Sequence, residues 1–164
     1  MKYSLVVIGC NDGTNLTSII NNCAKSGSVL LVEPVPWLNE ILTKKFKTKE
    51  QVLIDRRAIS TSKGEATFYA PKKGKKTSKY YSTGIGSLKK SHITDHGLSV
   101  KSDFEEITVN TINPNDLFRE YNITSIDTLI VDVEGLDAEI LALIDYNSIE
   151  QLLEHSNDLQ FLSL

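Results

Sequence analysis

The first 34 residues of this chain contain the pattern that most restricts its fold. An apolar run at Leu5–Ile8 precedes a turn with Gly9 and Gly13, then a helical pattern and a second apolar run that ends at Glu33. Runs of mostly β-branched residues without polar alternation are typical of strands buried on both faces of a parallel sheet. A strand, a glycine turn, a helix and a second strand with an acid at its tip, about 20 residues after the turn, predict the first βαβ unit of a nucleotide-binding fold.

The helix of this unit is expected at Thr14–Lys25. Its apolar residues recur at helical spacing, and Gly27 favours the left-handed stop of a helix. Glu33 follows the second strand, Val29–Val32, at the end where open α/β sheets place ligand contacts. An acid in that place can accept two hydrogen bonds from a ribose diol; the alternative is an ordinary surface acid.

The rest of the chain continues to alternate strands and helices. We expect further helices at Pro36–Phe46, from Asn113 to about Tyr121 and at Asp137–Ile144, and strands at Gln51–Asp55, Glu65–Tyr69, Ile107–Ile112 and Thr128–Val133, with Gln151–Glu154 as a candidate for one more. This order predicts an α/β fold with a doubly wound, mostly parallel sheet. A length of 164 residues fits one domain, residues 1–164.

Composition excludes several functional classes. An apolar share of 40% and a formal charge of -3 are typical of a soluble globular protein and carry no overall signal for nucleic acid or membrane. Eight of the 18 Lys and Arg residues lie between Lys63 and Lys90, however, within or beside a long loop at 71–90. We expect this segment to be a basic loop or a lid; stacking of Tyr80 and Tyr81 on nucleic-acid bases is the less favoured alternative, because the whole chain is acidic. Two cysteines are too few for a disulfide framework, so reduced thiols and a cytoplasmic location are expected.

The glycine turn does not fit a dinucleotide. That fingerprint requires glycine at positions 9, 11 and 14, and the chain has Gly9, Asn11 and Thr14 there. A pyrophosphate must approach the backbone closely at the helix start, so these losses weigh against NAD and FAD. The spacing of Gly9 and Gly13 is instead that of the outer glycines in the turn of S-adenosylmethionine enzymes.

With these residues in view, the chain resembles the FkbM-type methyltransferases, a branch of the class I S-adenosylmethionine-dependent enzymes. The resemblance runs in order from about Val6 to about His155 and rests on four blocks: Gly9-Cys-Asn-Asp-Gly13, Val32-Glu-Pro34, Ala58-Ile-Ser60 with Gly64 and Phe68, and Ile126-Asp-Thr-Leu-Ile-Val-Asp-Val-Glu-Gly135. It implies a Rossmann-like class I methyltransferase fold and methyl transfer to a hydroxyl of a sugar or small metabolite. The chain ends before the closing antiparallel strands usual in class I enzymes, so we expect a C-terminally short form.

The resemblance also implies roles for particular residues. The cofactor would be bound by Gly9, Cys10, Asn11, Asp12, Gly13, Glu33, Pro34, Asp55 and Ala58, with the glycine turn around the methionine part, Glu33 at the ribose, and Asp55 and Ala58 at the adenine. Asp132 and Glu134 would face the transferred methyl. Two positions depart from the family: Val7 stands where an acid is usual, and Ile130 where a lysine is usual.

Asp132 and Glu134 are the candidate catalytic residues. A hydroxyl acceptor benefits from a positioned base, and we expect Asp132 first and Glu134 second in this role. Two alternatives stay open: chelation of a divalent cation by the paired acids, which is possible but not favoured, and a structural role with Asp132 capping the next helix and Glu134 in solvent. We therefore expect no bound metal.

Other reactive side chains have plainer interpretations. Cys10 is expected to be a packing residue rather than a nucleophile, and His92 and His96 to lie on a solvated loop rather than to bind zinc. His155 is expected to be solvated or structural. For the whole chain, the alternative to an enzyme is a non-catalytic module that binds an adenosine ligand, or a decayed methyltransferase. Nothing in the pattern indicates an oligomeric state.

Overall fold

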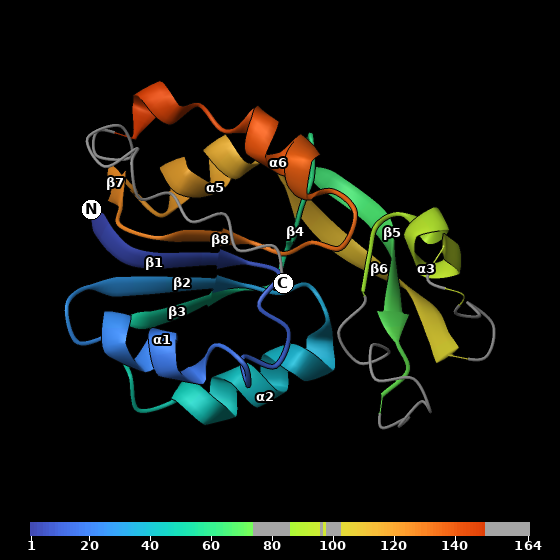
Figure 1. Ribbon diagram of the computed structural model, residues 1–164, viewed down its shortest axis with the longest axis horizontal. Coiled ribbons are helices and arrows are strands. Elements are labelled where there is room, and N and C mark those ends of the chain that lie inside the picture. The colour runs from blue at the N-terminus through green and yellow to red at the C-terminus, as the bar shows by residue number, and fades with distance from the viewer. Residues whose placement is uncertain (74–85, 96, 98–102, 150–164) are drawn as a thin grey trace.

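A computed structural model describes residues 1–73, 86–95, 97 and 103–149 of the chain. Figure 1 shows a parallel sheet between two layers of helices, with a smaller sheet beside the ends of its strands. No helix among the described residues is long and apolar enough to span a membrane.

The parallel sheet is built around the first strand. Its strands are β1 (Lys2–Ile8), β2 (Ser28–Val32), β3 (Val52–Asp55), β7 (Ser125–Ile126) and β8 (Leu129–Val131). The order is β3-β2-β1, and both β7 and β8 pair with the other edge of β1; all of these pairings are parallel. The predicted α/β fold with a mostly parallel central sheet is confirmed.

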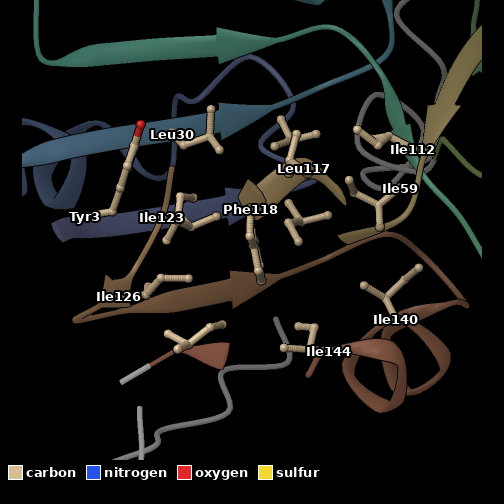
Figure 2. Packing of buried hydrophobic residues seen from close by; sticks show 14 residues of the cluster. Tyr3, Leu30, Ile59, Ile112, Leu117, Phe118, Ile123, Ile126, Ile140 and Ile144 are labelled. Atoms are coloured by element: carbon tan, nitrogen blue, oxygen red, sulfur yellow. The ribbon is translucent and has the colours of Figure 1, made fainter. Parts of the chain in front are cut away.

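In the described part of the chain, two helices cover each face of this sheet. The helices α1 (Thr17–Cys23) and α2 (Pro36–Phe46) lie on one face, and α5 (Pro114–Glu120) and α6 (Asp137–Leu143) lie on the other. Successive strand residues alternate between them: Val7 packs in one apolar cluster with α1 and α2, whereas Val6 packs in another with α5 and α6. Figure 2 shows Leu117 and Phe118 of α5 within the second cluster. Successive residues of β1 and of β2 face opposite apolar clusters, so both strands are continuous apolar runs in the sequence.

Local sequence signals account for the helix ends. The Asn113 side chain accepts a hydrogen bond from the backbone N–H of Asn115 at 2.9 Å, and Pro114 takes the first position of α5. Helix α1 begins at Thr17, three residues later than predicted. The reason lies in the preceding turn, where the Asp12 carboxylate binds the N–H of Thr14 at 2.8 Å and extends the turn into the expected first helical residues.

The smaller sheet differs from the prediction. Its strands are β4 (Ala58–Ile59), β5 (Gly64–Pro71) and β6 (Phe104–Ile112), and β6 pairs antiparallel with β5 and parallel with β4. The predicted strands at Glu65–Tyr69 and Ile107–Ile112 therefore form a separate sheet rather than extending the parallel one. Three short elements were not predicted: the two-residue strands β4 and β7, and the helix α3 (Lys90–Asp95). Elements this short show no periodicity in the sequence.

The smaller sheet is anchored where the parallel strands end. Phe68 of β5 packs in a cluster with Val35, Trp37 and Leu38 from the start of α2. On its other side α3 packs through Ile93. The segment predicted as a loop at 71–90 begins with the last residue of β5 and ends with the first residue of α3; its residues 74–85 lie outside the described part of the chain. A short 3-10 helix at Tyr146–Ser148 follows α6, and the candidate strand at Gln151–Glu154 is also outside.

Candidate functional site

The glycine turn after β1 has the backbone conformation that its glycines predict. Gly9 and Gly13 have φ values of 84° and 66°, and Asn11 adopts the left-handed region as well, with φ 51°. Asn11 tolerates it better than most residues because its short polar side chain bonds locally, here to the N–H of Asp12 at 2.6 Å. Lys45 of α2 donates to the carbonyl of Asp12 at 2.9 Å. The turn is thus held by an internal hydrogen bond and by a contact from α2.

Glu33 is a buried acid at the centre of this site. Its side chain is 5% exposed, and its two carboxylate oxygens accept the backbone N–H groups of Asn11 and Val35, each at 2.9 Å. Burial raises the pKa of Glu33 to about 7, although both backbone hydrogen bonds work against this rise. The alternative of a surface acid is wrong. Each carboxylate oxygen has a second lone pair, so the bonds to the backbone leave acceptor capacity for a ligand hydroxyl.

The tip of β8 lies directly against the glycine turn. The N–H of Asp132 donates to the carbonyl of Ile8 at 2.9 Å. A side chain at Gly9 has no room, because its Cβ would lie 1.9 Å from the carbonyl oxygen of Asp132. The predicted cofactor turn and the first predicted catalytic acid are therefore neighbours.

Asp132 has the electrostatics of a group that exchanges a proton near neutral pH. Burial, and then the nearby charges of Glu134 and Asp137, raise the pKa of Asp132 to about 6. A carboxyl group with this pKa is mostly ionised at pH 7 and is a stronger proton acceptor than an ordinary aspartate.

The alternative in which Asp132 caps the next helix and Glu134 lies in solvent is wrong. Asp137, not Asp132, accepts the N–H groups at the start of the turn, from Val133 at 2.9 Å and Gly135 at 3.2 Å. Glu134 is not simply solvated either: its carboxylate lies 2.9 Å from the Nε2 of His92. Both acids are partly buried.

His92 is the residue of this site that sequence reasoning missed. It was expected on a solvated loop, but it lies on α3 and its side chain is 18% exposed. His92 is 42 residues away from Glu134 in the chain, and only the position of α3 beside the smaller sheet brings them together. No local sequence signal reports such a contact.

Asp55 points to a different set of partners. Arg57 binds its carboxylate with two nitrogens, at 2.6 and 3.0 Å, and the hydroxyl of Tyr121 donates to it at 3.1 Å. Although burial alone would raise it, the pKa of Asp55 is lowered by these hydrogen bonds and by the charge of Arg57. Asp55 therefore links β3 to the end of α5, and its contact with adenine remains a prediction. Ala58, the other expected adenine neighbour, is 4% exposed in β4.

The remaining candidates divide between core and turn. Cys10 is 2% exposed within the apolar cluster under α1 and α2, and its burial raises the thiol pKa well above the usual range. Pro34 is partly buried next to Glu33. Among the residues that the structure describes, no three His, Cys, Asp or Glu side chains gather in a way that could hold a metal ion. His96 and His155 lie outside the described ranges.

Comparison with known proteins agrees with this arrangement. The family model described as the methyltransferase FkbM domain matches residues 8–160, which include the glycine turn, Glu33 and the β8 tip. No curated protein and no solved structure matched the chain in the same comparisons. Since the family model covers nearly the whole sequence, the chain belongs to the methyltransferases of the FkbM domain family.

Proposed function

We propose that this methyltransferase transfers a methyl group from S-adenosylmethionine to a hydroxyl of a sugar or small metabolite. The observation that carries the proposal is Glu33, a buried acid bonded to the glycine turn through Asn11, in a turn whose Gly9 lies against the β8 tip. The cofactor's ribose diol fits the remaining acceptor capacity of Glu33. Its methionine part fits the turn at Gly9–Gly13, which lies at the carboxyl end of β1 beside Asp132.

The chemistry needs alignment and a proton acceptor. When bound, S-adenosylmethionine supplies an electrophilic methyl: the oxygen–carbon bond to the acceptor forms as the sulfur–carbon bond breaks, and the bonding pair stays on sulfur. Asp132 accepts the proton of the acceptor hydroxyl. A general base of this kind contributes roughly 10²–10⁴-fold to the rate, and alignment of the reacting atoms contributes much of the remainder.

Calorimetric titration of S-adenosylmethionine tests the assignment of the cofactor. We expect binding to the parent protein and at least about tenfold weaker binding to Glu33→Gln, which keeps the shape but replaces one acceptor oxygen with an NH₂ donor that cannot accept a ribose hydroxyl. Glu50→Gln, an exposed acid before β3, is the control and should bind as the parent does. No heat with the parent, or equal affinities in the parent and Glu33→Gln, would contradict the proposal.

Transfer of a labelled methyl group to a panel of simple sugars and polyols tests the reaction. With any acceptor that is methylated, Asp132→Asn should lower the rate by ~10²–10⁴-fold at unchanged cofactor affinity. The parent rate should rise with pH through about 6 as Asp132 loses its proton. A full rate in Asp132→Asn would exclude it as the base.

A binding module without catalysis is the second candidate. It is favoured by Val7 and Ile130, which are buried apolar side chains at the two positions where the family resemblance implies an acid and a lysine. Binding of S-adenosylmethionine without transfer to any member of the panel would support this candidate.

A further inference from the structure

Glu134 is held in a conformation that an unassisted glutamate avoids. Its φ is 55°, in the left-handed region that is unfavourable for a non-glycine residue, and Gly135 follows with φ 93°. Three contacts from one segment hold this turn: the Ser87 hydroxyl donates to the carbonyl of Glu134 at 2.8 Å, Lys89 donates to the carbonyl of Gly135 at 3.2 Å, and His92 bonds to the Glu134 carboxylate.

His92 is fitted closely to this turn. Its Nε2 lies 2.9 Å from Oε2 of Glu134, and the two side chains are 18% and 28% exposed. The imidazole occupies the space beside Gly135, where an added Cβ would lie 2.6 Å from Nδ1. Gly135 is therefore required both for its backbone conformation and for the approach of the ring. A carboxylate packed in this way cannot turn freely into solvent.

The segment that carries His92 is itself fixed to the smaller sheet. Ser87 exchanges two backbone hydrogen bonds with Tyr69 of β5, and Ile93 of α3 is buried against Phe104 of β6. Lys89 also forms an ion pair with Glu139 of α6. Through this segment the smaller sheet contacts the β8 tip of the parallel sheet and holds the Glu134 side chain there.

Glu134 lies at the β8 tip, beside the turn proposed to bind the cofactor. The β8 tip touches Gly9, so a cofactor held with its methionine part in the glycine turn would bring its sulfur toward this tip. That sulfur is a cation before transfer and a neutral thioether afterwards. A carboxylate fixed nearby would attract the first and not the second, and partial burial of the Glu134 side chain, which is 28% exposed, strengthens such an attraction.

We propose that His92 is a positioning residue that holds the Glu134 carboxylate toward the cofactor's sulfonium, so that the site binds S-adenosylmethionine in preference to its demethylated product. This inference rests on the proposed cofactor. It gives the smaller sheet a role in turnover: transfer of the methyl group removes the charge that Glu134 attracts, and the product is released more readily.

Calorimetry with two ligands, S-adenosylmethionine and S-adenosylhomocysteine, tests this inference without knowledge of the acceptor. The measured quantity is the ratio of the two dissociation constants. We expect His92→Ala to lower the preference for the sulfonium ligand about three- to tenfold, while affinity for the neutral ligand changes little. Glu134→Gln keeps the side-chain shape, removes the charge and should lower the preference at least as much.

Two further variants separate positioning from general damage. His92→Gln places an amide N–H at a similar reach and should restore most of the preference. Ser91→Ala changes an exposed residue of the same helix and should leave the ratio at the parent value. A loss of stability weakens both ligands together and leaves the ratio unchanged.

The outcomes distinguish the two proposals. If the parent binds neither ligand, the proposed cofactor is wrong and this inference falls with it. If the parent binds both ligands and the ratio is the same in His92→Ala and Glu134→Gln, the cofactor assignment stands and the role of His92 is refuted. If His92→Ala lowers the ratio but His92→Gln does not restore any of it, the hydrogen bond to Glu134 is not the cause, and positioning is likewise refuted.

Discussion

The buried acid Glu33 should make the stability of this protein fall as the pH rises. Its pKa is raised from 4.5 to about 7 by burial, so the folded state holds the proton more tightly than the unfolded state does. The stability contributed by this proton is fully present below pH 4.5 and is lost as the pH rises through 7. A shift of this size corresponds to about 3 kcal/mol, since one pKa unit is ~1.4 kcal/mol.

The substitution Glu33→Gln isolates this contribution. The amide does not titrate, but its NH₂ group faces one of the two backbone N–H donors of Asn11 and Val35, which costs about 1–2 kcal/mol at every pH. The variant should therefore be less stable than the parent at pH 5 and as stable or more stable at pH 8. The difference in unfolding free energy between variant and parent should therefore change by most of the ~3 kcal/mol between pH 5 and pH 8.

Urea unfolding of both proteins between pH 5 and pH 8 measures the difference in their free energies of unfolding. Other titrating groups, Asp132 among them, are present in both chains and cancel in the difference. Glu50→Gln on the surface should run parallel to the parent. Parallel pH profiles for Glu33→Gln and the parent would show that the folded protein does not hold a proton on Glu33 near neutral pH, and the argument from burial would fail.

Three further substitutions have expected effects on the free energy of unfolding, each measured by urea denaturation. Gly9→Ala should cost about 3 kcal/mol or more, because φ is 84° and the new methyl would overlap the carbonyl of Asp132; a loss below about 1 kcal/mol would mean that the turn and the β8 tip are not in contact. Asp55→Asn should cost about 2 kcal/mol at pH 7 by weakening the pair with Arg57, and the cost should disappear in acid, since the lowered pKa of Asp55 gives stability that is lost as the pH falls through the folded value. Leu117→Ala, at a fully buried position, should cost about 3 kcal/mol at every pH, and a pH-dependent loss would contradict an apolar origin.

The parallel sheet was predictable because its strands are buried on both faces. Leu5–Ile8 and Val29–Val32 read as unbroken apolar runs, and each contributes alternately to the clusters on the two faces. Helix α2 was predicted to the residue, since Pro36 marks its start and its inward side chains follow helical spacing. These signals are local, and the packing of the fold agrees with them.

The smaller sheet and part of the site were not predictable, for a common reason. The antiparallel pairing of β5 with β6 joins Gly64 to Thr111, and nothing in either segment specifies a partner so distant in the chain. Glu33 and Asp132 were predicted as site residues because each directly follows a strand of the parallel sheet, and Asp132 also because of the family resemblance. His92 was not, because its position depends on α3 and the smaller sheet, and a histidine on a short helix has no pattern of its own.

The two separate partners of β1 have a consequence for how the chain folds. The segment Lys2–Ile8 pairs on one edge with β2, about 25 residues later, but on its other edge with β7 and β8, which lie more than 120 residues away. During synthesis the first half of the parallel sheet can form early, while the second edge of its central strand stays open until almost all of the described chain has left the ribosome. Pairings this distant slow folding and expose an unpaired strand edge in the meantime. The strand that leads into the glycine turn is therefore enclosed late, and the turn should reach its final shape only in the concluding step of folding.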